Sequence, residues 1–372
     1  MKQKIVIVGA GVLGCSLAHE LTRAGALVTV LDAGEVGSGA SAATFAWVNS
    51  NDKYPDEYSN LNLLGLQAHE HQTRTFSSRR WFHQTGNLQI ARTGRQMALL
   101  EQKVLEHAAR GIEARVISPS QMRRLEPSLQ TSGMAGGAFF PREGWVDVPA
   151  MCTGLLSRAI EAGAAFLPHQ TVTSVRNGGV TTTTHDGHRR DHAADIVLLA
   201  AGNGNRTILA SADIPFPTTD PSSTSAASVG VIGTTGRTDC GITHIISGDG
   251  LLLRPARNGG IMFAEHPTPN NWDIHDPRLW RVPSQLFDRV REFYPCLSNV
   301  AIETVNLGIR VLPEDGLTIA DWIGQEKSIY AVATHSGVTL APYLAQAITE
   351  EVIHGRRHDA LAAFGLSRFA PT

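Results

Sequence analysis

The sequence predicts an α/β protein with two domains, and residues 4–32 carry the clearest signal. They have the pattern of a strand, a glycine-rich turn, a helix and a second strand. The chain has 372 residues, which is more than one simple core usually organises. Apolar residues make up 42% and charged residues 18%, as is typical of a globular protein rather than a disordered one.

The first strand is expected over residues 4–8, an apolar and β-branched run that suits a buried parallel strand. Three glycines follow with the spacing G-x-G-x-x-G, and each has a physical role. Gly9 permits the tight turn, Gly11 lets the backbone approach a pyrophosphate, and Gly14 lets the helix pack closely on the strand. The helix over 12–24 then offers free N–H groups and the positive end of its dipole to phosphates.

The second strand is expected over residues 27–31 and ends at Asp32. A carboxylate at this position accepts hydrogen bonds from the adenosine ribose of a bound dinucleotide, although a solvated turn residue is the alternative. The order of strand, glycines, helix, strand and acid predicts a Rossmann-like dinucleotide-binding domain. The small and hydroxyl-bearing residues 37–43 come next, where a nicotinamide dehydrogenase would usually continue with strand and helix units. They can lie along a pyrophosphate and a flavin, so we expect FAD.

Further elements follow along the chain. We expect helices over 60–71, 96–110, 119–125, 148–163, 285–294 and 342–355. We expect strands over 165–175, 180–184, 195–200 and 329–334, and a hairpin over 250–263 that turns at 258–260. Residues 133–144 are glycine-rich and are assigned to a loop or an edge strand, whereas 215–241 show no clear pattern.

Bulk composition excludes several classes of partner. The net charge of −2 gives no reason to expect nucleic acid. No apolar run is long enough to span a bilayer, and the N-terminal apolar run contains the glycine fingerprint rather than a signal-peptide cleavage pattern. The cysteines are widely separated, which predicts neither a zinc site nor a disulfide framework and favours a reducing, cytoplasmic location. They are Cys15, Cys152, Cys240 and Cys296.

The sequence resembles the D-amino-acid oxidase, glycine oxidase and sarcosine oxidase superfamily of FAD-dependent oxidoreductases (the DAO family) over nearly its whole length. The resemblance lies in four places: the fingerprint with 37–43, the strand 170–175, the strand and turn 194–202, and the C-terminal segments 308–316 and 335–342. It implies a Rossmann-like FAD-binding domain of the glutathione-reductase-like type and a substrate domain on a mixed β-sheet. The implied FAD-binding domain is discontinuous, over 1–80, 145–210 and 300–372, with the substrate domain over 81–144 and 211–299.

The resemblance also implies the residues that hold FAD. The first turn of the C-terminal helix would place its dipole at the flavin N1–C2=O2 region and stabilise the reduced anion, although Ser336 could simply cap an ordinary helix. The implied cofactor residues are Gly9, Gly11, Val12, Leu13, Gly14, Asp32, Ala33, Ser38, Ser41, Ala42, Val172, Ala201, Gly202, Arg310, Ser336, Gly337, Val338 and Thr339. Family members with covalent flavin use a cysteine near the segment of Arg310, and this chain has none there, so non-covalent FAD is expected.

Three residues are candidates for catalysis. Arg310 occupies the position at which the family holds a substrate carboxylate, and a guanidinium binds that group bidentately. A structural ion pair with a nearby acid is the alternative for Arg310. The resemblance places His266 and His335 facing the flavin, where each could bind substrate or move a proton, or could be a hydrogen-bonded structural histidine.

The chain also departs from the family pattern. Residues 251–253 are leucines where relatives often carry a tyrosine that helps to hold the carboxylate, and Val311 follows Arg310 where the family has proline. Trp47 could shape the pocket or be a core residue. No metal-protease, Walker or nucleophile-elbow motif occurs, and no metal site is expected.

These features predict an enzyme that oxidises the C–N bond of an amino acid or related amine by hydride transfer to flavin N5, giving an imine. An FAD-carrying subunit of a heteromeric amine or opine dehydrogenase, or a biosynthetic tailoring amine oxidase, stays open as an alternative. The expected partner is a small-molecule amine, and the chain could form a homo-oligomer or act as a hetero-subunit.

Overall fold

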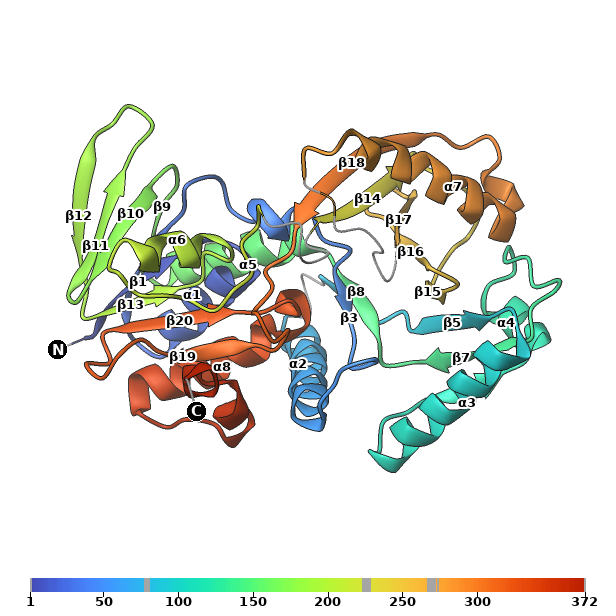
Figure 1. The fold of residues 1–372 in the computed structure, drawn as a ribbon, viewed down its shortest axis with the longest axis horizontal. Coiled ribbons are helices and arrows are strands. Elements are labelled where there is room, and N and C mark those ends of the chain that lie inside the picture. The colour runs from blue at the N-terminus through green and yellow to red at the C-terminus, as the bar shows by residue number, and fades with distance from the viewer. Residues whose placement is uncertain (1, 77–80, 223–228, 266–271, 273, 371–372) are drawn as a thin grey trace.

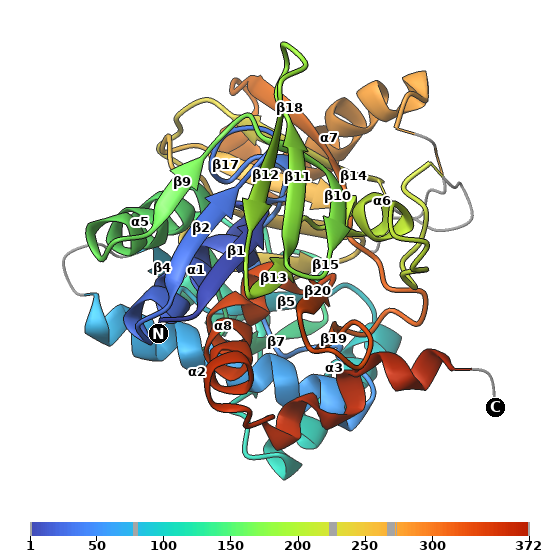
Figure 2. The same cartoon turned by 90° about the vertical axis from the view of Figure 1, so that its left-hand side faces the viewer.

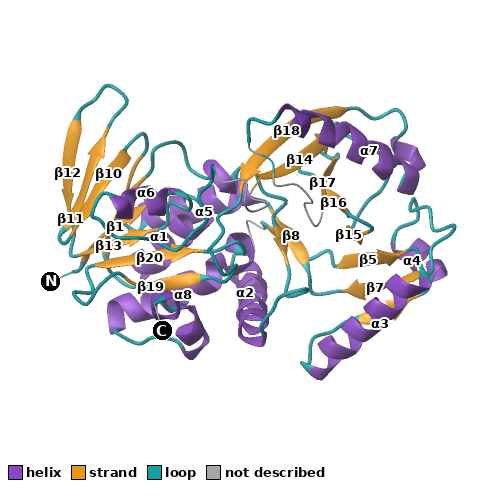
Figure 3. Ribbon diagram, in the orientation of Figure 1, coloured by secondary structure: helices purple, strands orange, loops and turns teal. Residues whose placement is uncertain are grey.

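The computed structural model describes residues 2–76, 81–222, 229–265, 272 and 274–370. Figure 1 shows two lobes side by side, one built on a six-stranded sheet and the other on an eight-stranded sheet. Figure 3 shows how the helices surround these sheets. The predicted α/β fold is therefore confirmed. Among the described helices, none is long and apolar enough to cross a membrane.

The six-stranded sheet contains the predicted dinucleotide-binding unit. All its strand pairs are parallel except β19 with β20. In spatial order the strands are β19 (Ile319–Trp322), β20 (Ile329–Ala333), β13 (Ile196–Leu199), β1 (Lys4–Val8), β2 (Leu27–Leu31) and β9 (Ala165–Leu167). Its helices are α1 (Val12–Arg23), α2 (Asp56–Thr75), α5 (Val148–Glu161), α6 (Gly204–Ala210) and α8 (Gly337–His354).

Alternate side chains of β1 face opposite layers of this lobe. Ile5 and Ile7 pack with α1, α5 and α8 in one apolar cluster. Val6 and Val8 pack in another cluster with a small antiparallel sheet of β10 (Thr171–Arg176), β11 (Gly179–Thr183) and β12 (Arg189–Ala193). Figure 2 shows this small sheet lying over the larger one. Burial on both faces explains why β1 is apolar throughout rather than alternating.

The eight-stranded sheet forms the second lobe and is mixed, because β15 pairs parallel with β5 while its other pairs are antiparallel. Its strands in order are β18 (Ile302–Ile309), β14 (Val229–Thr235), β17 (Ile261–Glu265), β16 (Leu251–Pro255), β15 (Ile245–Gly248), β5 (Asn87–Ala91), β7 (Gly136–Phe140) and β6 (Arg115–Ile117). Its helices are α3 (Gly94–Ala109), α4 (Pro119–Leu125) and α7 (Val282–Phe293). Short strands β3 (Trp47–Val48), β8 (Gly144–Val146) and β4 (Phe82–His83) form a second small sheet.

We propose that the two large sheets mark the two domains expected from the sequence. Within the expected range 300–372, β19, β20 and α8 belong to the six-stranded sheet and its helices, whereas β18 lies at the edge of the eight-stranded sheet. The chain therefore passes from one lobe to the other directly after β18, at Arg310.

Several element predictions need correction. The expected strand 165–175 is two strands in different sheets, because Pro168 and the positive-φ residue His169 (φ 57°) break it. The glycine-rich segment 133–144 contains β7, which lies between β5 and β6 and not at an edge. Strand β14 lies in the segment that showed no clear pattern, and β12 was not predicted.

The C-terminal helix begins at Gly337 and not at Pro342 as predicted, because a neighbouring helix compensates for the proline. Pro342 has no N–H to donate to the carbonyl of Val338, four residues earlier. His69 of α2 occupies that carbonyl instead, with its Nε2 at 2.8 Å. Burial lowers the pKa of His69 to about 4, so the ring is neutral and Nε2–H is the donor. Gly355 ends the helix in the left-handed conformation, as expected.

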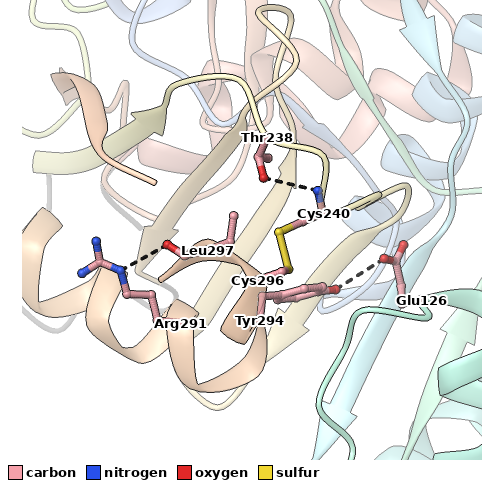
Figure 4. The surroundings of a disulfide bond; sticks show 7 residues. All are labelled: Glu126, Thr238, Cys240, Arg291, Tyr294, Cys296 and Leu297. Carbon is pink, nitrogen blue, oxygen red and sulfur yellow. Dashed lines mark hydrogen bonds between the residues drawn. A yellow bond between two sulfur atoms is a disulfide. The ribbon is translucent and has the colours of Figure 1, made fainter. Parts of the chain in front are cut away.

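The prediction that the cysteines form no disulfide is wrong for one pair. Cys240 and Cys296 are bonded, with their Cα atoms 5.9 Å apart and their positions 56 apart in sequence (Figure 4). The bond joins the loop after β14 to the segment after α7. Nearby, the Tyr294 hydroxyl donates to the buried carboxylate of Glu126 at 3.5 Å. The argument for a reducing compartment that rested on cysteine spacing therefore loses its support.

Candidate active site

A large cavity lies where the two lobes meet, with a volume of about 1190 Å³. It is lined by the fingerprint loop, the segment 38–53, the ends of β10 and β13, the strand β18 and the start of α8. Ordinary small-molecule sites occupy roughly 300–1,000 Å³. The cavity is therefore large enough for a dinucleotide together with a small substrate.

The glycine loop has the geometry that its spacing predicts. A Cβ on Gly9 would lie 2.5 Å from the Ala200 carbonyl oxygen, and one on Gly14 would lie 1.7 Å from the Gly9 carbonyl oxygen. Gly9 also has a φ of +107°, which disfavours a side chain. Gly11, Val12 and Leu13 border the cavity, whereas Gly14 packs against Gly9 behind it.

Asp32 organises this loop and also faces the cavity. Its Oδ2 accepts the Ala10 N–H at 2.6 Å and its Oδ1 accepts the Gly34 N–H at 2.8 Å. Each oxygen retains a further lone pair, which can accept a ribose hydroxyl. Ala33 lies beside it in the cavity wall.

The segment 38–44 forms the opposite side of the phosphate region. The Ser41 hydroxyl accepts the Val12 N–H at 3.2 Å, and a Cβ on Gly11 would lie 2.9 Å from this oxygen. Ser38 and Ser41 border the cavity, whereas Ala42, which was expected to hold the cofactor, does not border it. The main-chain amides that follow Gly11 and the Ser41 hydroxyl thus lie together at the edge of the cavity where a pyrophosphate would bind.

Two strand ends complete the dinucleotide end of the cavity. Val172, at the start of β10, borders it together with Gln170, whose N–H donates to the Asp32 carbonyl at 2.7 Å. Ala201 and Gly202 border it after β13, and Gly202 turns with a φ of +59°.

The first turn of α8 closes the far end of the cavity. Gly337, Val338 and Thr339 all border it. Ser336 precedes them but does not cap the helix with its side chain; its Oγ instead accepts from the Tyr58 hydroxyl at 2.8 Å. A helix of this length directs the positive end of its dipole into the cavity.

Arg310 borders the cavity directly after β18. Its guanidinium lies over Gly230, where a Cβ would be 3.2 Å from Nη2, and its Nη1 is 3.5 Å from the Val229 carbonyl oxygen. Burial lowers the pKa of this group below its ordinary value. Asp315, an acid five positions further along the chain, pairs with Arg368 at 2.7 Å.

Of the two candidate histidines, the structure describes His335 alone. His335 borders the cavity just before α8. His266 lies outside the described residues. Leu252, from the leucine run that replaces the family tyrosine, faces the cavity, whereas Leu251 and Leu253 are buried in the core of the second lobe.

Lys53, near the α8 end of the cavity, was not among the residues predicted from the sequence. Lys53 borders it and donates to Ser336 Oγ at 3.3 Å. Trp47 also borders it, and its indole N–H donates to Glu143 Oε2 at 3.0 Å. Burial raises the pKa of Glu143 to about 8. The polar run 49–53 is the sequence signal that could have indicated Lys53.

Comparison with known proteins defines the class. A family model described as "FAD dependent oxidoreductase" (DAO) matches residues 4–351. The chain belongs to this family of FAD-dependent oxidoreductases, as its sequence predicted.

Individual relatives resemble it over nearly their whole length. An opine oxidase subunit of Agrobacterium tumefaciens (strain Ach5) is 25% identical, over 98% of this chain and 97% of the relative. Glycine oxidase of Geobacillus kaustophilus (strain HTA426) is 23% identical, over 98% and 96%. The crystal structure of glycine oxidase from Geobacillus kaustophilus covers all of both chains with a TM-score of 0.85 at 20% identity, which establishes the shared fold.

The cavity fits the FAD that this family uses. Gly11 borders the cavity without a side chain beside the expected pyrophosphate, and each Asp32 oxygen retains a lone pair that can accept a ribose hydroxyl. In the described part of the chain, no cluster of histidine, cysteine or acidic residues could hold a metal ion.

Proposed function

We propose that this enzyme oxidises the C–N bond of an amino acid or N-substituted amino acid whose carboxylate binds Arg310. The observation that carries the proposal is the Arg310 guanidinium in the wall of a cavity that is also lined by apolar residues such as Leu252 and Ile232. A buried guanidinium favours an anionic ligand, and its planar fork matches a carboxylate.

The protein residues have distinct proposed tasks. Bound FAD supplies the chemistry, which is acceptance of a hydride from the substrate carbon that bears nitrogen. Arg310 fixes the carboxylate and so orients that carbon, and the apolar wall around Leu252 excludes water. His335 is proposed to contact the substrate or to accept its amine proton, and His266 stays a prediction of the same kind.

An N-substituted amino acid is favoured over a simple D-amino acid. Two opine oxidase subunits match 98% of the chain at 25% and 24% identity, slightly above the 23% of glycine oxidase over the same share. Leu252 borders the cavity in the run where relatives often carry a tyrosine, and a leucine offers no hydroxyl to hold the carboxylate of a simple amino acid. We also propose that the enzyme is located in the cytoplasm.

The test is anaerobic reduction of the purified flavoprotein with a panel of substrates. Glycine, D-amino acids, N-methyl amino acids and opines are added separately, and the visible flavin absorbance is recorded. We expect bleaching by the N-substituted compounds at the lowest concentrations. If no member of the panel bleaches the flavin, the proposal is wrong.

A second candidate is an FAD-carrying subunit of a heteromeric enzyme, because the A. tumefaciens relative is itself described as a subunit. A biosynthetic tailoring amine oxidase is the remaining alternative. Size-exclusion chromatography with oxygen-consumption assays distinguishes a self-sufficient oxidase from a subunit. A chain that is reduced by substrate but turns over only with an added partner or dye supports the second candidate.

A further inference from the structure

Lys53 is a cation in the cavity wall that the family resemblance does not account for. It follows β3 in a loop and reaches the residue just before α8, where its Nζ donates to Ser336 Oγ at 3.3 Å. The two residues are separated by 283 positions in sequence. Lys53 therefore brings a full positive charge to the region where the α8 dipole already places a partial one.

The loop that carries Lys53 is held in one conformation. Asp52 has a positive φ of 53°, which is uncommon for a residue other than glycine. Its carboxylate pairs with Lys103 of α3 at 2.7 Å, and Lys103 also donates to Gln89 of β5 at 3.2 Å. Because strained backbone persists only where its surroundings hold it, this network fixes the direction of Lys53.

Across the ranges described, no carboxylate lies within 4 Å of the Lys53 ammonium. The Asp52 carboxylate forms an ion pair with Lys103. Burial raises the pKa of Glu143 to about 8, which leaves that carboxyl largely protonated at neutral pH. An ammonium has three donors, and among the residues that the structure describes Ser336 Oγ accepts one of them. The others remain for a ligand in the cavity. Burial lowers the pKa of Lys53, so an anion placed beside it would favour its charged form.

We propose that Lys53 and the first turn of α8 together form the electrostatic site that stabilises the negative charge of the reduced flavin. Negative charge on the reduced ring gathers at the N1–C2=O2 edge, which the family places at this helix. The helix alone supplies about half a charge, and Lys53 adds a full one. Lys53 thereby tunes the reduction potential of FAD and is distinct from Arg310, to which we assign the substrate carboxylate.

The test uses the oxidised flavoprotein without substrate. Sulfite adds to flavin N5 and leaves negative charge at the same edge of the ring, so its affinity reports the local charge. We expect Lys53→Met to weaken sulfite binding about tenfold, as removal of one partly buried charge implies. The two-electron midpoint potential, measured by dye equilibration, should fall by about 30 mV, which is that factor of ten converted.

Three variants serve as controls. Lys53→Arg keeps the charge and should bind sulfite within about threefold of the wild type. Arg95→Met removes an exposed charge from α3, away from the cavity, and should change neither measurement. Should Lys53→Met fail to hold FAD, Lys53→Cys is measured before and after alkylation with 2-bromoethylamine, which restores an amine in a single preparation.

The outcomes separate this proposal from the proposed function. Unchanged sulfite affinity and unchanged potential in Lys53→Met would overturn the assignment. The same result with weaker substrate binding would mean that Lys53 holds the substrate and not the flavin charge. Because neither measurement involves a substrate, failure of the amine panel leaves this test intact.

Discussion

Three glycine-to-alanine substitutions distinguish packing behind the cavity from contact with the cofactor. A Cβ on Gly14 would lie 1.7 Å from the Gly9 carbonyl oxygen, half of the 3.4 Å at which ordinary contact begins. The Gly9 carbonyl belongs to the backbone and cannot rotate away like a side chain, so α1 must move away from β1. Overpacking of this kind typically costs 1–3 kcal/mol, and about 3 kcal/mol or more is expected for Gly14→Ala.

Gly11→Ala should behave differently. Its Cβ would meet Ser41 Oγ at 2.9 Å, and that side chain can rotate away. The new methyl group would then occupy the cavity beside the expected pyrophosphate. We expect a change in unfolding free energy below about 1 kcal/mol and a loss of FAD affinity of about tenfold or more.

Gly94→Ala is the matched control, because no heavy atom lies within 4 Å of its added Cβ and its φ is ordinary. Urea unfolding of the apoprotein measures stability, and fluorescence titration with FAD measures affinity. If Gly11→Ala binds FAD like the wild type, the backbone at Gly11 does not face the pyrophosphate. If Gly14→Ala is as stable as Gly94→Ala, the close helix–strand contact is not present in solution.

Three further predictions concern Arg310, the Cys240–Cys296 disulfide and Glu143. Arg310→Met should lower kcat/KM for carboxylate-bearing amines by about 100-fold, as expected for losing charge-assisted hydrogen bonds of about 1.5–3 kcal/mol each. An equal loss for amines that lack a carboxylate would contradict the assignment of Arg310 to the substrate carboxylate. Reduction of the Cys240–Cys296 bond should lower the unfolding free energy by about 2–4 kcal/mol without releasing FAD, and the double alanine variant should be insensitive to reductant. The folded state holds a proton on Glu143, whose pKa rises from 4.5 to about 8, so this group makes stability fall as pH rises between those values. Glu143→Gln should remove that part of the pH dependence, at most about 4 kcal/mol in urea unfolding between about pH 5 and pH 8, and an unchanged slope would show that Glu143 is ionised.

The dinucleotide end of the site could be predicted because its chemistry is local. Gly9, Gly11 and Gly14 act through backbone geometry within one turn, and Asp32 ends the neighbouring parallel strand. Their spacing in sequence therefore fixes their arrangement in space.

The rest of the site depends on contacts between distant segments. Lys53 meets Ser336 across 283 residues, and Trp47 meets Glu143 across 96, so no spacing rule connects them. The early start of α8 depends on His69, which satisfies the carbonyl that Pro342 leaves open. The disulfide likewise depends on how α7 packs, which cysteine spacing does not encode.

A crystal structure of the purified yellow protein, grown without added ligand, tests the central claim most directly. We expect density for one FAD per chain, not covalently attached, with its phosphates at the amides of Gly11 and Val12. Its ring should lie between Arg310 and the start of α8. A flavin bound elsewhere, a ring that points away from Arg310, or a protein that cannot take up FAD would contradict the account.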